Sequence, residues 1–118
     1  MNVKNKMNLI KFHNTVDKII LILEKFLDNY SGKIDIDYES HSNIMKISIC
    51  FKNEIIISKQ EFLKQIWIAT KYKGYHFEYY KKKWFCKRNK CELFDFLKNF
   101  FKKKIGKNII KFIKKNKY

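Results

Sequence analysis

The residues best placed to do chemistry in this sequence are carboxylates at regular spacing in the first third of the chain. In the stretch KIDIDYES, residues 33–40, every second residue is an acid: Asp35, Asp37 and Glu39. Successive side chains of a strand point to opposite faces, so this spacing predicts three carboxylates on one face and apolar groups on the other. The alternation alone favours the simplest interpretation, a half-buried strand whose outer face is in water.

A second set of polar side chains lies on a predicted first helix. From Leu9 to Tyr30, apolar residues recur every three or four positions, as the buried side of a helix requires. Four polar residues fall in one arc away from that side; they are His13, Asp17, Glu24 and Asp28. Between His13 and Glu39 six acids stand against three lysines, in a chain with a net charge of +16. We therefore expect an acidic edge, formed by the helix and the strand, in an otherwise basic protein.

The chemistry that this edge favours is the binding of hard cations. Carboxylate oxygens suit such ions, and no paired set of thiolates or imidazoles favours zinc instead. Asp35 and Asp37 would lie about 7 Å apart along the strand, too far to chelate one ion tightly between them. Any metal site here is expected to be shallow and weak, with waters kept on the metal.

The elements that position these residues follow the order helix, strands, helix. Helical spacing returns from about Lys90 to Ile105, with Gly106 as a reasonable stop. Between the helices, short polar turns favour antiparallel connections. We predict an α+β two-layer sandwich, with the N- and C-terminal helices packed on one face of an antiparallel sheet of five to six strands. The predicted strands lie in IDIDYE, IMKISICF, EIII, LKQIWIAT, YHFEYY and WFCKR.

One of these strands carries a tryptophan on its outer side. Alternation sends Ile66 and Ile68 toward the helices, and therefore sends Trp67 and its neighbours Gln65 and Ala69 to the open face. A large apolar group on a solvent-facing sheet is typical of a contact surface. The alternative is that a loop or the C-terminal tail covers it.

The segment around this tryptophan resembles the frataxin family, in its bacterial CyaY branch. Residues 60–69, QEFLKQIWIA, follow the family pattern Q-x-P-x-x-Q-x-W-L-A, with Phe62 in place of the proline. The resemblance runs on through ATKYKGYHFEYYKKKWFC and back to KFHNTVDKI, and covers roughly residues 7–106. It implies a frataxin-like domain at 7–106, between a flexible segment 1–6 and a basic tail 107–118. Whether Met1 or Met7 is the true start is left open.

The resemblance also implies a function and its residues. It implies a cytoplasmic, monomeric protein of iron-sulfur cluster assembly, with no catalysis of its own, that binds iron and docks on the cysteine desulfurase and its scaffold protein. The implied iron site, for Fe2+ or Fe3+, is the acidic edge: His13, Asp17, Glu24, Asp28, Asp35, Asp37 and Glu39. The implied partner-binding residues are Gln60, Gln65, Trp67 and His76. Four positions where many bacterial members carry acids are not acidic here, so we expect weak iron binding; they are Lys25, Asn29, Ser31 and Lys33.

The basic composition supports two alternatives. A net charge of +16 predicts nonspecific attraction to nucleic acid or to anionic membrane. The lysines and aromatic residues of the tail are typical of single-strand binders, but Arg88 is the only arginine, and arginine makes the commonest specific base contact. The tail could also form a short amphipathic helix on a membrane through Ile105, Ile109, Ile110 and Ile113, or it could be a frayed or packed extension of the last helix.

The remaining reactive residue types form no recognisable catalytic set. Cys50, Cys86 and Cys91 lack the CxxC spacing of zinc and redox sites, so we expect reduced thiols that pack in the core of a protein in a cytoplasm-like compartment. The sequence has no arrangement typical of a Ser-His-Asp or Cys-His centre and no glycine-rich phosphate loop. The apolar run IILILEKFL is too short to span a bilayer.

Overall fold

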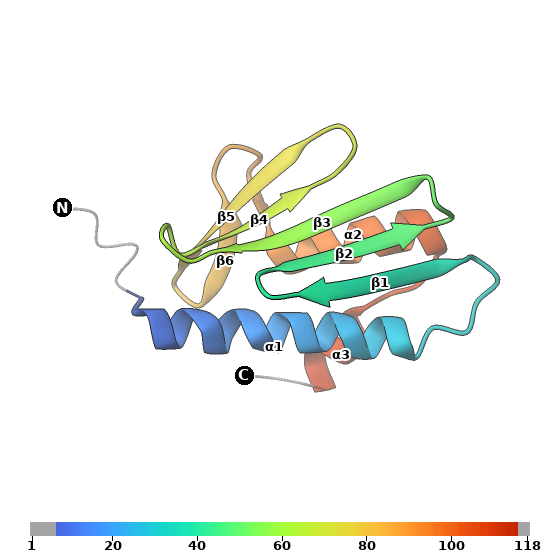
Figure 1. The fold of residues 1–118 in the computed structure, drawn as a ribbon, viewed down its shortest axis with the longest axis horizontal. Coiled ribbons are helices and arrows are strands. Elements are labelled where there is room, and N and C mark those ends of the chain that lie inside the picture. The colour runs from blue at the N-terminus through green and yellow to red at the C-terminus, as the bar shows by residue number, and fades with distance from the viewer. Residues whose placement is uncertain (1–6, 116–118) are drawn as a thin grey trace.

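The sheet of this protein is a simple antiparallel meander, flanked in the chain by helices (Figure 1). A computed structural model describes residues 7–115. The helices are α1 (Leu9–Asp28), α2 (Leu93–Ile105) and α3 (Ile110–Lys115). The seven strands lie in the sheet in their order along the chain. They are β1 (Ile36–His41), β2 (Ile44–Ile49), β3 (Asn53–Gln60), β4 (Gln65–Ala69), β5 (Gly74–Tyr80), β6 (Lys83–Cys86) and β7 (Cys91–Glu92).

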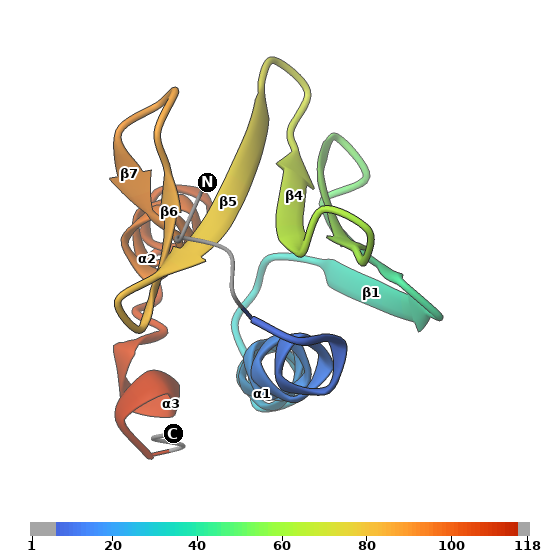
Figure 2. The same cartoon turned by 90° about the vertical axis from the view of Figure 1, so that its left-hand side faces the viewer.

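One face of the sheet carries the core. In one row that crosses four strands, Met45 pairs with Ile57, Ile57 with Ile68, and Ile68 with Tyr75. The first three are buried and Tyr75 is partly buried against them. The buried sides of α1 and α2 belong to the same core, so the predicted two-layer sandwich with both helices on one face is confirmed. Figure 2 shows α1 beside β1 and α2 beside β6 and β7, near the two ends of the curved sheet.

The sheet has one strand more than predicted. The addition, β7, is a two-residue strand in which Cys91 pairs with Cys86 and Glu92 with Phe85. Two residues are too few to show an alternating pattern, and the sequence therefore suggested an earlier start of the last helix. That helix begins at Leu93, because the side chain of Glu92 accepts a hydrogen bond from the backbone N–H of Asp95 at 3.1 Å and caps it.

Other element boundaries also differ from the prediction by a few residues, and two of them lie at the acidic edge. The first helix ends at Asp28 rather than Tyr30, and the backbone N–H of its C-cap residue, Asn29, bonds to carbonyls of the last turn. The first strand begins at Ile36, and Asp35 precedes it, although the Asp35 carbonyl still accepts a hydrogen bond from the Cys50 N–H at 2.8 Å. Asp35 therefore lies just before the strand and still bonds to the neighbouring chain segment through its backbone.

The described part of the C-terminal tail packs on the body of the protein. Ile105 and Ile109 are buried, and the ring of Phe112 lies 5.6 Å from that of Phe26 on α1. These contacts match the packed extension at Ile105 and Ile109, whereas Ile110 and Ile113 are only partly buried. No helix within residues 7–115 is long and apolar enough to cross a membrane. The segment 1–6, which we predicted to be flexible, lies outside the described residues.

Gly106 ends α2 in a backbone conformation that favours glycine. Its φ is +68°, and its N–H donates to the carbonyl of Lys102. An added Cβ would meet nothing within 4 Å, so space is not the constraint. Any cost of a substitution there comes from the backbone.

We expect Gly106→Ala to lower the free energy of unfolding by about 1 kcal/mol, since alanine is strained in the left-handed region. Urea denaturation followed by tryptophan fluorescence measures the change. Gly74→Ala is the matched control, because Gly74 has equal room for a Cβ and no positive φ. Equal effects of the two substitutions would contradict this account of the helix end.

Candidate functional site

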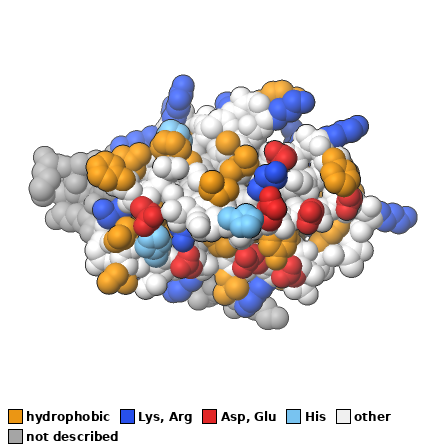
Figure 3. Space-filling model, in the orientation of Figure 1, with side chains coloured by type: hydrophobic (Ala, Val, Ile, Leu, Met, Phe, Trp, Pro, Cys, Tyr) orange, Lys and Arg blue, Asp and Glu red, His pale blue; other side chains and the backbone are white. Residues whose placement is uncertain are grey.

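The acidic edge predicted from the sequence is present as two rows of side chains. Figure 3 shows acidic side chains gathered over α1 and β1. Asp37 and Glu39 are exposed and alternate with Tyr38, which is packed against the core. The carboxylates of β1 therefore belong to the open side of the sheet, whereas Asp17, Glu24 and Asp28 belong to the helix.

Two hydrogen bonds join the helix row to the strand. The Tyr38 hydroxyl donates to Asp28 Oδ1 at 2.7 Å, and the Ser40 hydroxyl donates to Glu24 Oε2 at 3.4 Å. Both donors come from the side of β1 that faces α1. The helix carboxylates are thus held against the strand by neutral donors, which leave their negative charge in place.

The bond to Asp28 changes the acidity of the tyrosine. The pKa of Tyr38 is raised to about 12, chiefly because its phenol donates to Asp28, then by burial and by the charges of Asp28 and Glu24. Loss of the phenolic proton would break the bond and place two anions side by side.

A lysine that the sequence analysis did not single out occupies the other end of the helix row. Lys59 Nζ lies 3.0 Å from Asp17 Oδ1 and 3.4 Å from His13 Nδ1. Lys59 follows Ile55 and Ile57 on the inward-facing side of β3. The alternation of β3 could therefore have predicted from the sequence that this lysine points toward the helices. Asp17 is therefore paired with a cation in this structure.

His13 also bonds to Glu61, in the loop between β3 and β4. Its Nε2 lies 2.8 Å from Glu61 Oε2, and Asn43 Nδ2 donates to Glu61 Oε1 at 3.0 Å. An ammonium group can only donate, so the contact with Lys59 assigns Nδ1 as acceptor and Nε2 as the nitrogen that donates to Glu61. The bond with His13, followed by the bond from Asn43, lowers the pKa of the Glu61 carboxyl.

The seven candidate iron ligands do not converge on one point. Within residues 7–115, no three His, Cys, Asp or Glu side chains lie close enough together to hold one metal ion. Asp17 forms an ion pair with Lys59, and His13 lies against Glu61, so two of the seven candidates already have partners of their own. The edge is an open line of negative charge without a preformed chelate.

The predicted partner-binding residues meet on the open face of the sheet. The rings of Trp67 and His76 stack at 4.0 Å with an interplanar angle of 6°. Trp67 Nε1 donates to Gln65 Oε1 at 2.7 Å, and Gln65 Nε2 donates to Glu78 Oε2 at 3.3 Å. Gln60 pairs with Gln65 across the strands, and its own side chain bonds to Ser58. Trp67 is partly exposed on this face, so the alternative that a loop or the tail covers it fully does not hold within the described residues.

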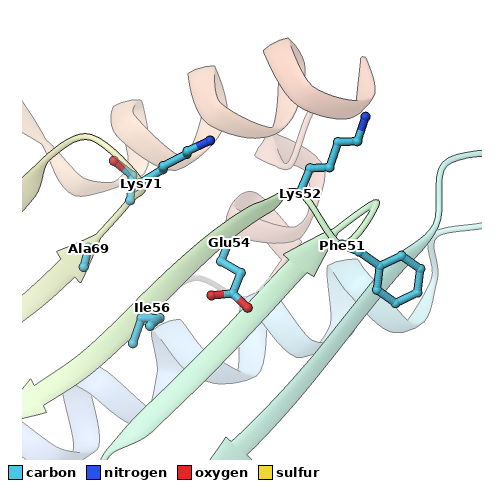
Figure 4. Close-up of a pocket in the computed structure, with 7 residues that line it drawn as sticks. Phe51, Lys52, Glu54, Ile56, Ala69 and Lys71 are labelled. Carbon is cyan, nitrogen blue, oxygen red and sulfur yellow. The ribbon is translucent and has the colours of Figure 1, made fainter.

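Two hollows lie on either side of this stack. One, of about 320 Å³, is lined by Phe51, Lys52, Glu54, Ile56, Ala69, Thr70 and Lys71. Figure 4 shows that its lining comes from the turn before β3, from β3 itself and from the end of β4. The other, of about 490 Å³, is lined by Glu78, Tyr80, Lys81, Lys83, Phe85 and Lys87 on β5 and β6 and beside them. The open face thus offers a fixed aromatic stack between two concave patches.

We expect Tyr38→Phe to remove a tyrosine titration step at about pH 12. The neutral phenol is favoured by folding, so its contribution to stability is complete below about pH 10 and is lost as the pH rises toward 12. Tyrosinate absorbance across the alkaline range measures the step, and Asp28→Asn should move it to lower pH. Tyr72→Phe, an exposed turn residue, is the control and should leave it in place. A wild-type titration with no step near pH 12 would show that Tyr38 and Asp28 are not bonded in solution.

Comparison with known proteins places this chain and its fold in one family. The family model of the frataxin-like domain matches residues 5–107. The iron-sulfur cluster assembly protein CyaY of Buchnera aphidicola subsp. Baizongia pistaciae is 44% identical over 96 residues, which cover 81% of each chain. The solved frataxin from Psychromonas ingrahamii superposes with a TM-score of 0.75 at 25% identity, over 86% of this chain and 95% of that one. The chain belongs to the frataxin family, in its bacterial CyaY branch.

Proposed function

We propose that this protein acts in iron-sulfur cluster assembly by docking on the cysteine desulfurase and its scaffold protein, with iron carried weakly on the acidic edge. It performs no catalysis of its own, and its role is to change the turnover of its partner. The observation that carries this proposal is the pairing of two surfaces on one small domain. A line of carboxylates on α1 and β1 borders an open sheet face built around the Trp67–His76 stack. The name of the Buchnera relative, an iron-sulfur cluster assembly protein, supports the same role.

The open face suits a protein partner. Trp67 is held by Gln65 and His76 before any partner arrives, so little side-chain entropy is lost on binding. Aromatic anchors next to concave patches are typical of the residues that contribute most to protein interfaces. We assign the scaffold protein to this face.

The acidic edge suits both a basic partner surface and a cation. Asp37 and Glu39 are exposed at the edge strand of the sheet, where nothing in the described residues covers them. A row of separated carboxylates attracts a complementary basic surface that comes close to the edge, and this is the role we assign to the desulfurase contact. Iron would keep most of its waters and bind as cargo, because the row provides no chelate of three ligands among the described residues.

The thiols fit the compartment that we propose. All three cysteines are free, and Cys50 is exposed. Exposed free thiols persist in a reducing compartment, so we place the protein in the cytoplasm. We also propose that it acts as a monomer.

We expect Trp67→Ala to weaken binding to the scaffold complex by about 30-fold in Kd, equivalent to about 2 kcal/mol. The loss arises because truncation removes the aromatic anchor and leaves His76 without its stacking partner. Biolayer interferometry with purified desulfurase and scaffold measures it. Tyr72→Ala removes an aromatic ring that is 85% exposed in the turn after β4, and it should change Kd less than about twofold. Equal affinities for both variants would contradict the use of this face.

We expect Asp37→Lys to weaken desulfurase binding by about tenfold at low salt, with a smaller effect at high salt, because Asp37 contributes charge without a buried contact. Asp95→Lys makes the same change of net charge on α2, away from the edge, and should alter binding little. The same two variants, titrated anaerobically with iron(II) in a calorimeter, test iron binding separately. If Asp37→Lys weakens desulfurase binding but leaves the heat of iron binding unchanged, the docking role stands and the iron site is overturned. If it changes the heat of iron binding but leaves desulfurase binding unchanged, the docking role is overturned.

A further inference from the structure

Two cysteines lie directly opposite each other at the end of the sheet farthest from the acidic edge. We propose that Cys86 and Cys91 form a redox site, which closes a reversible disulfide by exchange with a small anionic disulfide of the glutathione type. This proposal is independent of the docking function, because it uses neither the acidic edge nor the Trp67 face.

The register of the sheet brings the two thiols together. Cys86 on β6 is the direct partner of Cys91 on β7, across a connection of four residues. Partners in an antiparallel pair have Cα atoms about 4.5–5.5 Å apart, within the range of about 4.4–6.8 Å found in disulfides. Side chains of paired residues point to the same face of a sheet. The two sulfurs can therefore join with little movement of the backbone.

Their surroundings differ in access. Cys86 is 1% exposed, whereas Cys91 is only partly buried and lines a solvent-open hollow of about 300 Å³. Lys73 and Lys103 line the same hollow, together with Asp95 and the rings of Tyr75, Phe96 and Phe100. Figure 2 shows that β6 and β7 lie side by side next to α2. Residues of α2, from Asp95 to Lys103, line one side of the hollow. Two cations against one carboxylate favour an anionic reagent, and glutathione disulfide carries net negative charge on each half.

The buried thiol has the stronger hydrogen-bonding support. Asn89 Nδ2 donates to Cys86 Sγ at 3.4 Å. Burial alone would raise the pKa of Cys86, but bonds from the side chain of Asn89 and from nearby backbone groups outweigh it and hold that pKa below its ordinary value. Burial and the charge of Cys86 raise the pKa of Cys91. Cys86 is thus the better thiolate and Cys91 the accessible one.

These properties define two steps. The Cys91 thiolate attacks one sulfur of the small disulfide; that S–S bond breaks, one glutathione thiolate leaves, and Cys91 carries a mixed disulfide. The Cys86 thiolate then attacks the Cys91 sulfur, the mixed bond breaks, and the second glutathione thiolate leaves. The two protons lost by the cysteines pass to the two leaving thiolates. The protein dithiol is oxidised by two electrons and the small disulfide is reduced to two thiols.

The test uses the full-length chain with Cys50→Ser as background, because Cys50 is exposed and would react alone. The folded protein is incubated with glutathione disulfide and followed by intact mass, peptide mapping and free-thiol titration. We expect a product lighter by two hydrogens, with Cys86 linked to Cys91, and full recovery of both thiols on addition of a reducing dithiol. Circular dichroism before and after oxidation confirms that the fold is retained.

Two further substitutions on that background separate the roles of the thiols. Cys86→Ser should stop the reaction at the mixed disulfide and retain one glutathione on Cys91. Cys91→Ser should leave Cys86 reduced in the folded protein, at least about tenfold slower to react than Cys91, and reactive once urea exposes it. A stable glutathione adduct on the Cys50→Ser protein, or equal reactivity of Cys86 and Cys91 in the folded state, would overturn the proposal.

Discussion

Burial of one face of the sheet is the constraint on which the other features depend. Successive side chains of a strand point to opposite faces, so the neighbours of each buried side chain lie on the open face. Ile66 and Ile68 are buried, and Trp67 between them must therefore lie on the open side. A shift of register by one residue would exchange Trp67 with its buried neighbours, at the cost of the whole core row. The open face that carries Trp67 is thus fixed by the same packing that stabilises the fold.

The acidic edge follows from that constraint at the first strand. Tyr38 and Ser40 turn toward α1 and bond to its carboxylates, so the intervening acids turn outward. The two acidic rows are consequently placed by backbone geometry and held by neutral donors. Lys59 is the exception, since it reaches from the inward side of β3 to Asp17. It lowers the negative charge at the Asp17 end of the edge.

Much of this arrangement could be predicted from the sequence, because it depends on periodicity. The period of α1 and the alternation of KIDIDYES identified both acidic rows, and the alternation around Trp67 identified its face. What could not be predicted depends on contacts between residues distant in the chain. The bonds of His13 to Glu61 and of Lys59 to Asp17 join elements more than forty residues apart. The strand β7 and the pairing of Cys86 with Cys91 were missed because two residues give no pattern.

Charge is distributed unevenly over the surface of the protein. The carboxylates gather on α1 and β1, whereas the chain as a whole carries a net charge of +16. A basic surface is therefore attracted by the acidic edge and repelled by the net charge of the rest of the protein. Separated carboxylates suit contact with a basic surface better than they suit chelation, since that contact depends on the summed local charge while tight metal binding needs ligands that converge. In the function that we propose, this edge would therefore contact a protein and bind iron only weakly, and the Trp67 face would supply the short-range contacts that charge alone cannot.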